Sequence, residues 1–127
     1  MIVLTFGTFD LFHIGHKRIL QRAAEHGQLI VGISSDELNY SKKKKFPVYS
    51  YEQRKEIVES VRYVSKTFKE ESLEKKREYI LAHKADVLVM GDDWEGRFDF
   101  LSDVCKVIYL PRTASISTTA IIETIKS

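Results

Sequence analysis

The chain has 127 residues, of which 43% are hydrophobic and 30% are charged, and its formal net charge is +2. These values favour one globular domain with a core large enough to fold alone, and so small a charge gives no argument for nucleic-acid binding. No apolar run is long enough to cross a membrane, no signal-peptide pattern opens the chain, and the single cysteine, Cys105, excludes an internal disulfide. We therefore expect a cytoplasmic protein without a membrane span.

Strand and helix patterns alternate from the first residues. β-Branched and aromatic residues at 2–6 predict a strand, and apolar residues at helical spacing predict a helix at 14–26 that ends at Gly27. The continuous apolar run at 29–34 predicts a second strand, buried on both faces as in a parallel sheet. A short helical turn is expected at 35–40.

A loop at 41–50 separates this turn from the next helix, because its residues lack periodicity and include Pro47. Ser50 and Gln53 have the spacing of a capping box, which predicts a helix at 51–63. The later elements expected are a strand at 64–68, a helix from a cap at Ser72 to residue 83, a strand at 86–90, a loop at 91–96, a short helix at 98–104, a strand at 106–110 and a last helix at 118–126.

This order of elements predicts an α/β fold, a doubly wound parallel sheet in a single domain over residues 1–127. In such sheets the ligand lies beyond the carboxyl ends of the strands, where the strand order reverses. The segments that follow the first strand, the strand at 86–90 and the strand at 106–110 should all lie at that edge.

The segment FGTFDLFHIGHKR, residues 6–18, joins the first strand to the first helix. The first amides of a helix have no internal partner, and His13 and His16, three residues apart, face the same side. Imidazoles donate hydrogen bonds near neutral pH, and Gly7 lets the backbone approach a phosphate. The segment therefore predicts a polyphosphate site. Asp10 has three readings: it orients a histidine, holds a metal-bound water, or caps the helix.

Two further segments carry groups that suit phosphates. RTASISTT, residues 112–119, places one guanidinium and five hydroxyls before a helix, where Arg112 can grip a phosphate; a Ser/Thr-rich helix cap is the alternative. The run Lys42 to Lys45 is either a solvated loop or a basic loop that closes over anionic substrates. GxGxxG, P-loop and zinc-site patterns do not occur in the sequence, and no protein side chain is assigned to a metal.

The motifs FGTFDLFHIGH, YEQRK, RYV, VMGDDWEG, LPRT and ISTT together resemble the glycerol-3-phosphate cytidylyltransferase family, in the nucleotidylyltransferase superfamily that carries HxGH. The resemblance covers essentially the whole chain, with Ser115 where the family pattern RTxGISTT has glycine. It implies a Rossmann-like nucleotidylyltransferase fold and the reaction of CTP with sn-glycerol 3-phosphate to give CDP-glycerol and pyrophosphate, for teichoic-acid or capsular polymers. It also implies Mg²⁺ bound with CTP, and a homodimer with its contact near RYV.

The resemblance also implies roles for individual residues. His13, His16, Lys45 and Arg112 are expected to be catalytic. The expected nucleotide-binding residues are Gly7, Thr8, Phe9, His13, Ile14, Gly15, His16, Lys45, Asp93, Arg112, Thr113, Ala114, Ser115, Ile116, Ser117, Thr118 and Thr119. The expected acceptor-binding residues are Asp10, Lys43, Arg62 and Lys76.

The sequence leaves several residue roles and the function class open. Counting back from Tyr51 gives Lys43 and Lys45 as the functional lysines, whereas counting forward from Asn39 shifts both by one position. Asp92 or Asp93 is expected to assist either the magnesium ion or the nucleobase, and Trp94 either to stack on the base or to close the core. Other readings are a transferase that uses ATP or another phosphorylated alcohol, a non-catalytic nucleotide sensor, and a nucleic-acid-binding module.

Overall fold

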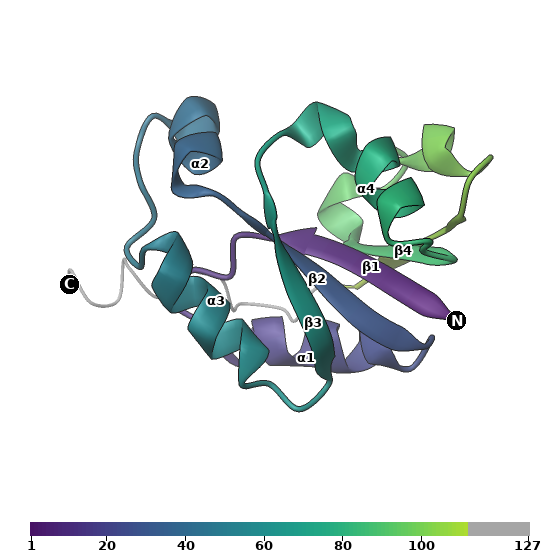
Figure 1. The fold of residues 1–127 in the computed structure, drawn as a ribbon, viewed down its shortest axis with the longest axis horizontal. Coiled ribbons are helices and arrows are strands. Elements are labelled where there is room, and N and C mark those ends of the chain that lie inside the picture. Colours follow the sequence, from purple (N-terminus) through teal and green to yellow (C-terminus); the bar gives the residue numbers. More distant parts are fainter. Residues whose placement is uncertain (112–127) are drawn as a thin grey trace.

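The structure, a computed structural model, describes residues 1–111 (Figure 1). Its centre is a parallel sheet with the strand order β3-β2-β1-β4-β5. The strands are β1 (Ile2–Gly7), β2 (Gln28–Ser34), β3 (Val64–Glu70), β4 (Val87–Gly91) and β5 (Lys106–Leu110). The predicted α/β fold with a doubly wound parallel sheet is therefore confirmed.

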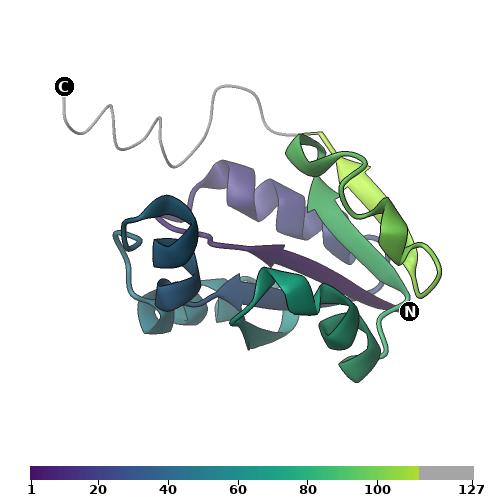
Figure 2. The same ribbon diagram turned by 90° about the horizontal axis from the view of Figure 1, so that it is seen from above.

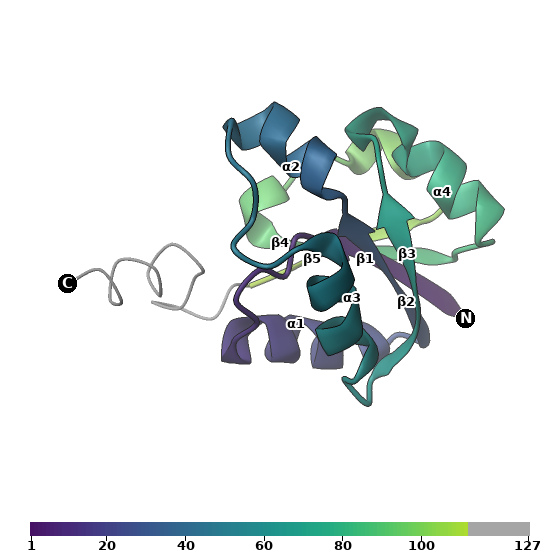
Figure 3. The same ribbon diagram turned by 60° about the vertical axis from the view of Figure 1, so that its left-hand side comes forward.

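Helices cover both faces of this sheet. They are α1 (Ile14–Ala24), α2 (Asp36–Lys43), α3 (Tyr51–Glu59) and α4 (Lys76–Ala82), with single 3₁₀ turns η1 (Leu73–Lys75), η2 (Asp92–Trp94) and η3 (Asp99–Leu101). Helices α1 and α3 lie on one side of the sheet and α4 on the other (Figures 1 and 3). Within the described residues, no helix is long and apolar enough to cross a membrane.

The core has two halves, one on each face of the sheet, because successive side chains of a strand point to opposite faces. On the α1 and α3 side, Val3 of β1 packs with Leu20, Val31 and Val58. The other half contains Leu4, Ile30, Ile80, Leu88 and Leu101. Burial on both faces explains why the segments of β1, β2 and β4 read as nearly continuous apolar runs.

The strand order reverses at β1. The chain leaves β1 through α1 to β2 and β3, and it later returns to the other side of β1 as β4. The Thr5 hydroxyl donates to the carbonyl of Val89 at 2.6 Å across this junction. The turn after β1 and helix α2 lie at the same end of the sheet (Figure 2), which is where a ligand site is expected.

Three predicted boundaries were wrong. Helix α2 runs to Lys43, into the segment predicted as a loop, because the Ser35 hydroxyl caps its start and Lys44, with φ 60°, ends it in a left-handed turn. Helix α3 ends at Glu59 and not at residue 63. The Ser60 hydroxyl donates a hydrogen bond to the Ile57 carbonyl at this end of the helix. The helix predicted at 98–104 is the single turn η3. The last predicted helix, 118–126, lies outside the described residues.

Candidate active site

A cavity of about 420 Å³ opens at the carboxyl ends of β1 and β4. This volume is within the range of small-molecule sites. The turn after β1 and the start of α1 contribute Gly7, Thr8, Phe9, Asp10, His13, Gly15 and His16 to its wall. The remaining wall residues are Thr5, Phe6, Ile19, Arg22, Asn39, Lys43, Lys45, Phe46, Pro47, Val48, Met90, Gly91, Asp93, Trp94 and Pro111.

The two histidines cap the first turn of α1 reciprocally. The backbone N–H of Gly15 donates to Nδ1 of His13 at 3.0 Å, and the backbone N–H of His13 donates to Nδ1 of His16 at 3.1 Å. A ring nitrogen that accepts a hydrogen bond carries no proton, so each neutral ring carries its proton on Nε2. The rings stack with centroids 3.8 Å apart and both line the cavity. The backbone thus prepares two imidazole N–H donors side by side.

The surroundings of these rings favour their neutral form. Burial lowers the pKa of His13. Burial, and in second place the repulsion from His13, lowers the pKa of His16 to about 4. In the free protein at pH 7 both rings are therefore neutral donors, which can stabilise charge that develops on a phosphate oxygen.

The turn between β1 and α1 is tightly shaped. Phe9 and Leu11 have positive φ angles, 56° and 47°, a conformation that side chains other than glycine adopt at some cost. A side chain on Gly7 would meet the ring of Phe9 at 2.8 Å. Gly7 is thus required to seat Phe9 in the core, a reason different from the close phosphate approach that the sequence suggested.

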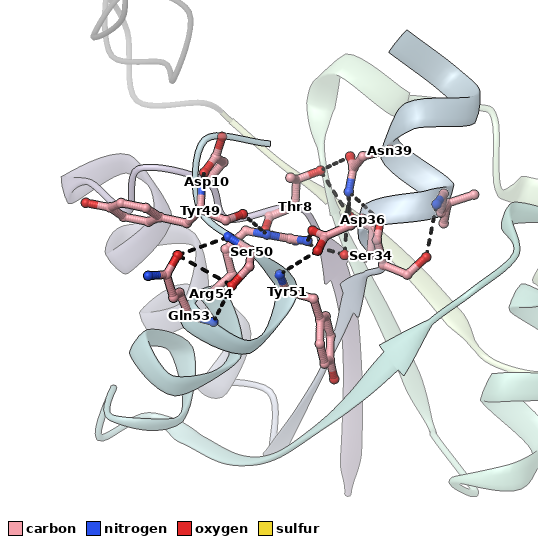
Figure 4. Close-up of polar contacts among 12 residues, drawn as sticks. Thr8, Asp10, Ser34, Asp36, Asn39, Tyr49, Ser50, Tyr51, Gln53 and Arg54 are labelled. Atoms are coloured by element: carbon pink, nitrogen blue, oxygen red, sulfur yellow. Dashed lines mark hydrogen bonds and ion pairs between the residues drawn. The ribbon is translucent and has the colours of Figure 1, made fainter. Parts of the chain in front are cut away.

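Asp10 joins this turn to residues 43–49, here called the lysine segment (Figure 4). Its carboxylate accepts the backbone N–H groups of Val48 at 2.7 Å and Tyr49 at 2.9 Å, as well as that of Leu11. The expected roles were to orient a histidine, to hold a metal-bound water or to cap the helix; the contacts of Asp10 instead orient the loop at residues 48 and 49, and the N-cap of α1 is His13.

Of the four adjacent lysines, Lys43 and Lys45 line the cavity and Lys42 and Lys44 do not. The alternation results from the end of α2, where the left-handed residue Lys44 turns the chain between the two. This placement agrees with the count back from Tyr51.

Other predicted site residues lie elsewhere. Arg62 is exposed and donates to the Tyr63 hydroxyl, and Lys76 is buried in an ion pair with Glu70. Neither lines the cavity, nor does Ile14. Arg112, Thr113, Ala114, Ser115, Ile116, Ser117, Thr118 and Thr119 lie outside the described residues.

The far end of the cavity holds Asp93 and Trp94, together with Pro111. Arg22 of α1 donates to the carbonyl of Pro111 at 3.2 Å, so the last described residue is fixed at the cavity wall. The Trp94 side chain is 37% exposed, which leaves part of the ring open to a ligand.

Little in the sequence pattern predicted the polar residues that support this cavity. Asn39 is almost fully buried, accepts the Thr8 hydroxyl at 2.9 Å and donates to the Ser34 hydroxyl at 2.7 Å. Arg54 is completely buried. An arginine on a polar helix normally faces solvent, so the sequence did not predict that Arg54 is buried. The nearby capping box predicted only where the helix starts.

Comparison with known proteins agrees with this geometry. Residues 4–124 match the cytidylyltransferase-like family. The chain is 55% identical over 124 residues to a glycerol-3-phosphate cytidylyltransferase of Bacillus subtilis, which covers 97% of this chain and 95% of that protein. It is 52% identical over 120 residues to the Staphylococcus aureus protein of the same name, over 94% of this chain and 90% of that one.

A similar fold occurs in solved structures. A lipopolysaccharide core biosynthesis protein from Thermoplasma volcanium matches with a TM-score of 0.75 and 17% sequence identity, over 89% of this chain and 98% of that one. At this identity the match shows the fold alone. The sequence matches, with the histidine pair at the β1–β4 junction, place this chain in the cytidylyltransferase-like family, and among its members with the glycerol-3-phosphate cytidylyltransferases.

Proposed function

We propose that this protein transfers CMP from CTP to sn-glycerol 3-phosphate, forming CDP-glycerol and pyrophosphate. The observation that carries the proposal is the pair of backbone-fixed imidazoles beside Lys43 and Lys45, in a chain 55% identical to an enzyme named for this reaction. CDP-glycerol would feed the synthesis of teichoic-acid or capsular polymers, and the protein itself would act in the cytoplasm.

The chemistry is an in-line displacement at the α-phosphorus of CTP. An oxygen of the acceptor phosphate forms the new P–O bond, the bond between the α-phosphorus and the β-phosphate oxygen breaks, and pyrophosphate leaves with the electron pair. The acceptor phosphate is already ionised near pH 7, so no strong general base is needed. The protein contributes position and charge stabilisation.

His13 and His16 donate through Nε2 to the α- and β-phosphate oxygens as charge builds there. Lys45, with Arg112 beyond the described residues, holds the triphosphate, and Lys43 holds the acceptor phosphate. Mg²⁺ bound with CTP would neutralise part of the charge on the phosphates, and one or two carboxylates of the protein would be enough to hold it. Asp93, which lines the cavity, is our candidate for contact with either the ion or the base.

The homodimer stays part of this proposal. Arg62 and Tyr63 pair on the exposed surface, in the RYV segment to which the family resemblance assigns the subunit contact. If Arg62 binds acceptor, it does so from this surface and not from the cavity described here.

The decisive experiment is pyrophosphate release with a panel of substrates. CTP and ATP are each offered with sn-glycerol 3-phosphate, phosphocholine, phosphoethanolamine and a pentitol phosphate. The proposal expects the highest kcat/KM for CTP with sn-glycerol 3-phosphate, and the product should have the mass of CDP-glycerol. Faster turnover with another acceptor, or with ATP, would replace this proposal by the corresponding transferase.

A further inference from the structure

The carboxyl end of the lysine segment is attached to the sheet by the buried carboxylate of Asp10. Asp10 is 7% exposed and, like Thr8, belongs to the cavity wall. Its oxygens accept Val48 N at 2.7 Å and Tyr49 N at 2.9 Å, amides that lie 38 and 39 positions further along the chain. Hydrogen bonds to an ionised acceptor are about twice as strong as neutral ones.

A buried guanidinium completes the attachment (Figure 4). Arg54 donates through Nε to the Tyr49 carbonyl at 3.1 Å, and through Nη1 to the carbonyls of Thr8 at 2.9 Å and Ser34 at 2.8 Å. Its Nη2 pairs with Asp36 at 2.7 Å. One side chain therefore holds the ends of β1 and β2, the start of α2 and the end of the lysine segment in one place.

The amino end of the segment is fixed as well. Asn39 of α2 is bonded to Ser34 and Thr8, so the helix that ends at Lys43 is attached to the same strand ends. Between the two attachments, Phe46 stacks on Tyr40 with ring centroids 4.7 Å apart. A segment held at both ends keeps Lys43 and Lys45 at the cavity wall without any ligand.

We propose that Asp10, supported by Arg54, is a positioning residue for substrate binding. It fixes the lysine segment, residues 43–49, so that Lys43 and Lys45 face the two substrates before they arrive. This differs from direct acceptor binding by Asp10, since its oxygens accept amides of the segment. The inference rests on the lysine roles given under the proposed function.

The first test is Asp10→Asn, which keeps the shape but replaces one acceptor oxygen by a donor that faces backbone N–H groups. The apparent dissociation constant of a substrate rises in proportion as the competent state becomes rarer. If the attached state falls to a tenth of the molecules, KM rises about tenfold for both CTP and sn-glycerol 3-phosphate, while kcat at saturation changes less than about threefold.

The matched control is Asp86→Asn. Like Asp10, Asp86 accepts hydrogen bonding from the backbone, in its case from the N–H of Ile2 at 2.8 Å. Asp86 lies at the opposite end of the sheet. Both KM values should stay at the parent level. A general loss of stability would move this control too, and a rise in its KM values as large as that of Asp10→Asn would overturn the positioning role.

A double-mutant cycle separates action through the lysines from direct contact. In a Lys45→Ala background, adding Asp10→Asn should change KM for CTP less than about twofold, because the group it positions is already gone. KM for the acceptor should still rise about tenfold through Lys43. An effect on CTP that is fully additive, or an effect on the acceptor alone in both backgrounds, would overturn the inference.

Two measurements do not depend on turnover. Hydrogen exchange at the amides of Val48 and Tyr49 should quicken in Asp10→Asn and not in Asp86→Asn. Binding of CTP alone can be followed by fluorescence of Trp94, the single tryptophan, which lines the cavity. Should the transferase assay fail with every acceptor, these readouts still decide the positioning role; unchanged exchange and unchanged CTP binding in Asp10→Asn would refute it.

Discussion

At the scale of single residues, the chemistry of the site is set by which ring nitrogen each histidine leaves for the ligand. Backbone N–H groups occupy both Nδ1 atoms, so the two rings present Nε2. In the proposed mechanism, a side chain at either position thus serves both the helix start and the substrate. Substitutions that imitate one nitrogen at a time can separate the two roles.

His16→Asn keeps an acceptor near the position of Nδ1, so the N–H of His13 stays bonded, but it removes the Nε2 donor. We expect kcat to fall about a hundredfold, equal to roughly 3 kcal/mol of transition-state stabilisation, with little change in CTP binding or thermal stability. Steady-state kinetics and a melting curve measure both. His16→Gln is the matched variant, since it loses the cap acceptor and keeps a donor, and it should lose less activity and more stability. Parent activity in His16→Asn would remove this ring from the mechanism.

The lowered pKa of His16 links protonation to folding. The unfolded chain takes up this proton near pH 6.5 and the folded protein only near pH 4. Since the unfolded state binds more protons between these values, stability is lost as the pH falls from about 7 towards 4. The loss from this group at pH 5 is about 2 kcal/mol. Urea unfolding of parent and His16→Asn at pH 8 and pH 5 measures it, and an equal pH dependence in both proteins would contradict the assignment.

At the scale of elements, α2, the lysine segment and α3 act as one unit. The Ser35 hydroxyl caps α2, Lys44 ends it in a left-handed turn, and the predicted capping box of Ser50 and Gln53 starts α3. These local signals fix where each helix stops. The end of α2 at Lys43 decides which lysines line the cavity, so helix capping would affect the proposed substrate binding.

Single alanine substitutions in the run test this link. Lys43→Ala should mainly raise KM for sn-glycerol 3-phosphate and Lys45→Ala that for CTP, each about tenfold or more, because a charged hydrogen bond to phosphate is lost. Lys44→Ala removes a lysine from the same segment that does not line the cavity, and its constants should match the parent. Equal effects of all three would mean that only the net charge of the loop matters.

At the scale of the whole molecule, one buried ion pair ties the end of β3 to the start of α4. Lys76 and Glu70 are 4% and 2% exposed, and the Lys76 ammonium also lies over the ring of Phe6, 4.2 Å from its centroid. The sequence suggested that Lys76 binds the acceptor. In the structure Lys76 pairs with Glu70. The ring of Phe6, which the ammonium contacts, lines the cavity, whereas Lys76 does not.

Glu70→Gln would leave a buried ammonium without its charge partner. We expect a loss of about 3 kcal/mol in the free energy of unfolding, because one partner of a buried pair is removed. The exposed pair of Arg77 and Asp103 gives the control, since solvent screens this pair and Asp103→Asn should lose much less free energy of unfolding than Glu70→Gln. Chemical denaturation of both variants compares them, and similar losses would show that burial adds nothing to the Glu70 pair.

The order of the elements, the parallel sheet and the histidine turn followed from the sequence alone. Each depends on neighbours along the chain: alternating or helical spacing of apolar residues, a cap three residues from its partner, and two imidazoles on one helical turn. The boundaries that failed, at the ends of α2 and α3, lie where a single hydroxyl or a left-handed residue competes with a continuing helix.

Only the tertiary structure decided what Asp10, Arg54 and Lys76 do. Their partners lie far off along the chain or across a turn, at Val48, at the ends of β1 and β2, and at Glu70. A charged side chain looks the same in a sequence whether water or a distant amide satisfies it, because the cost of burying the charge and the bonds that offset that cost exist only once the chain has folded.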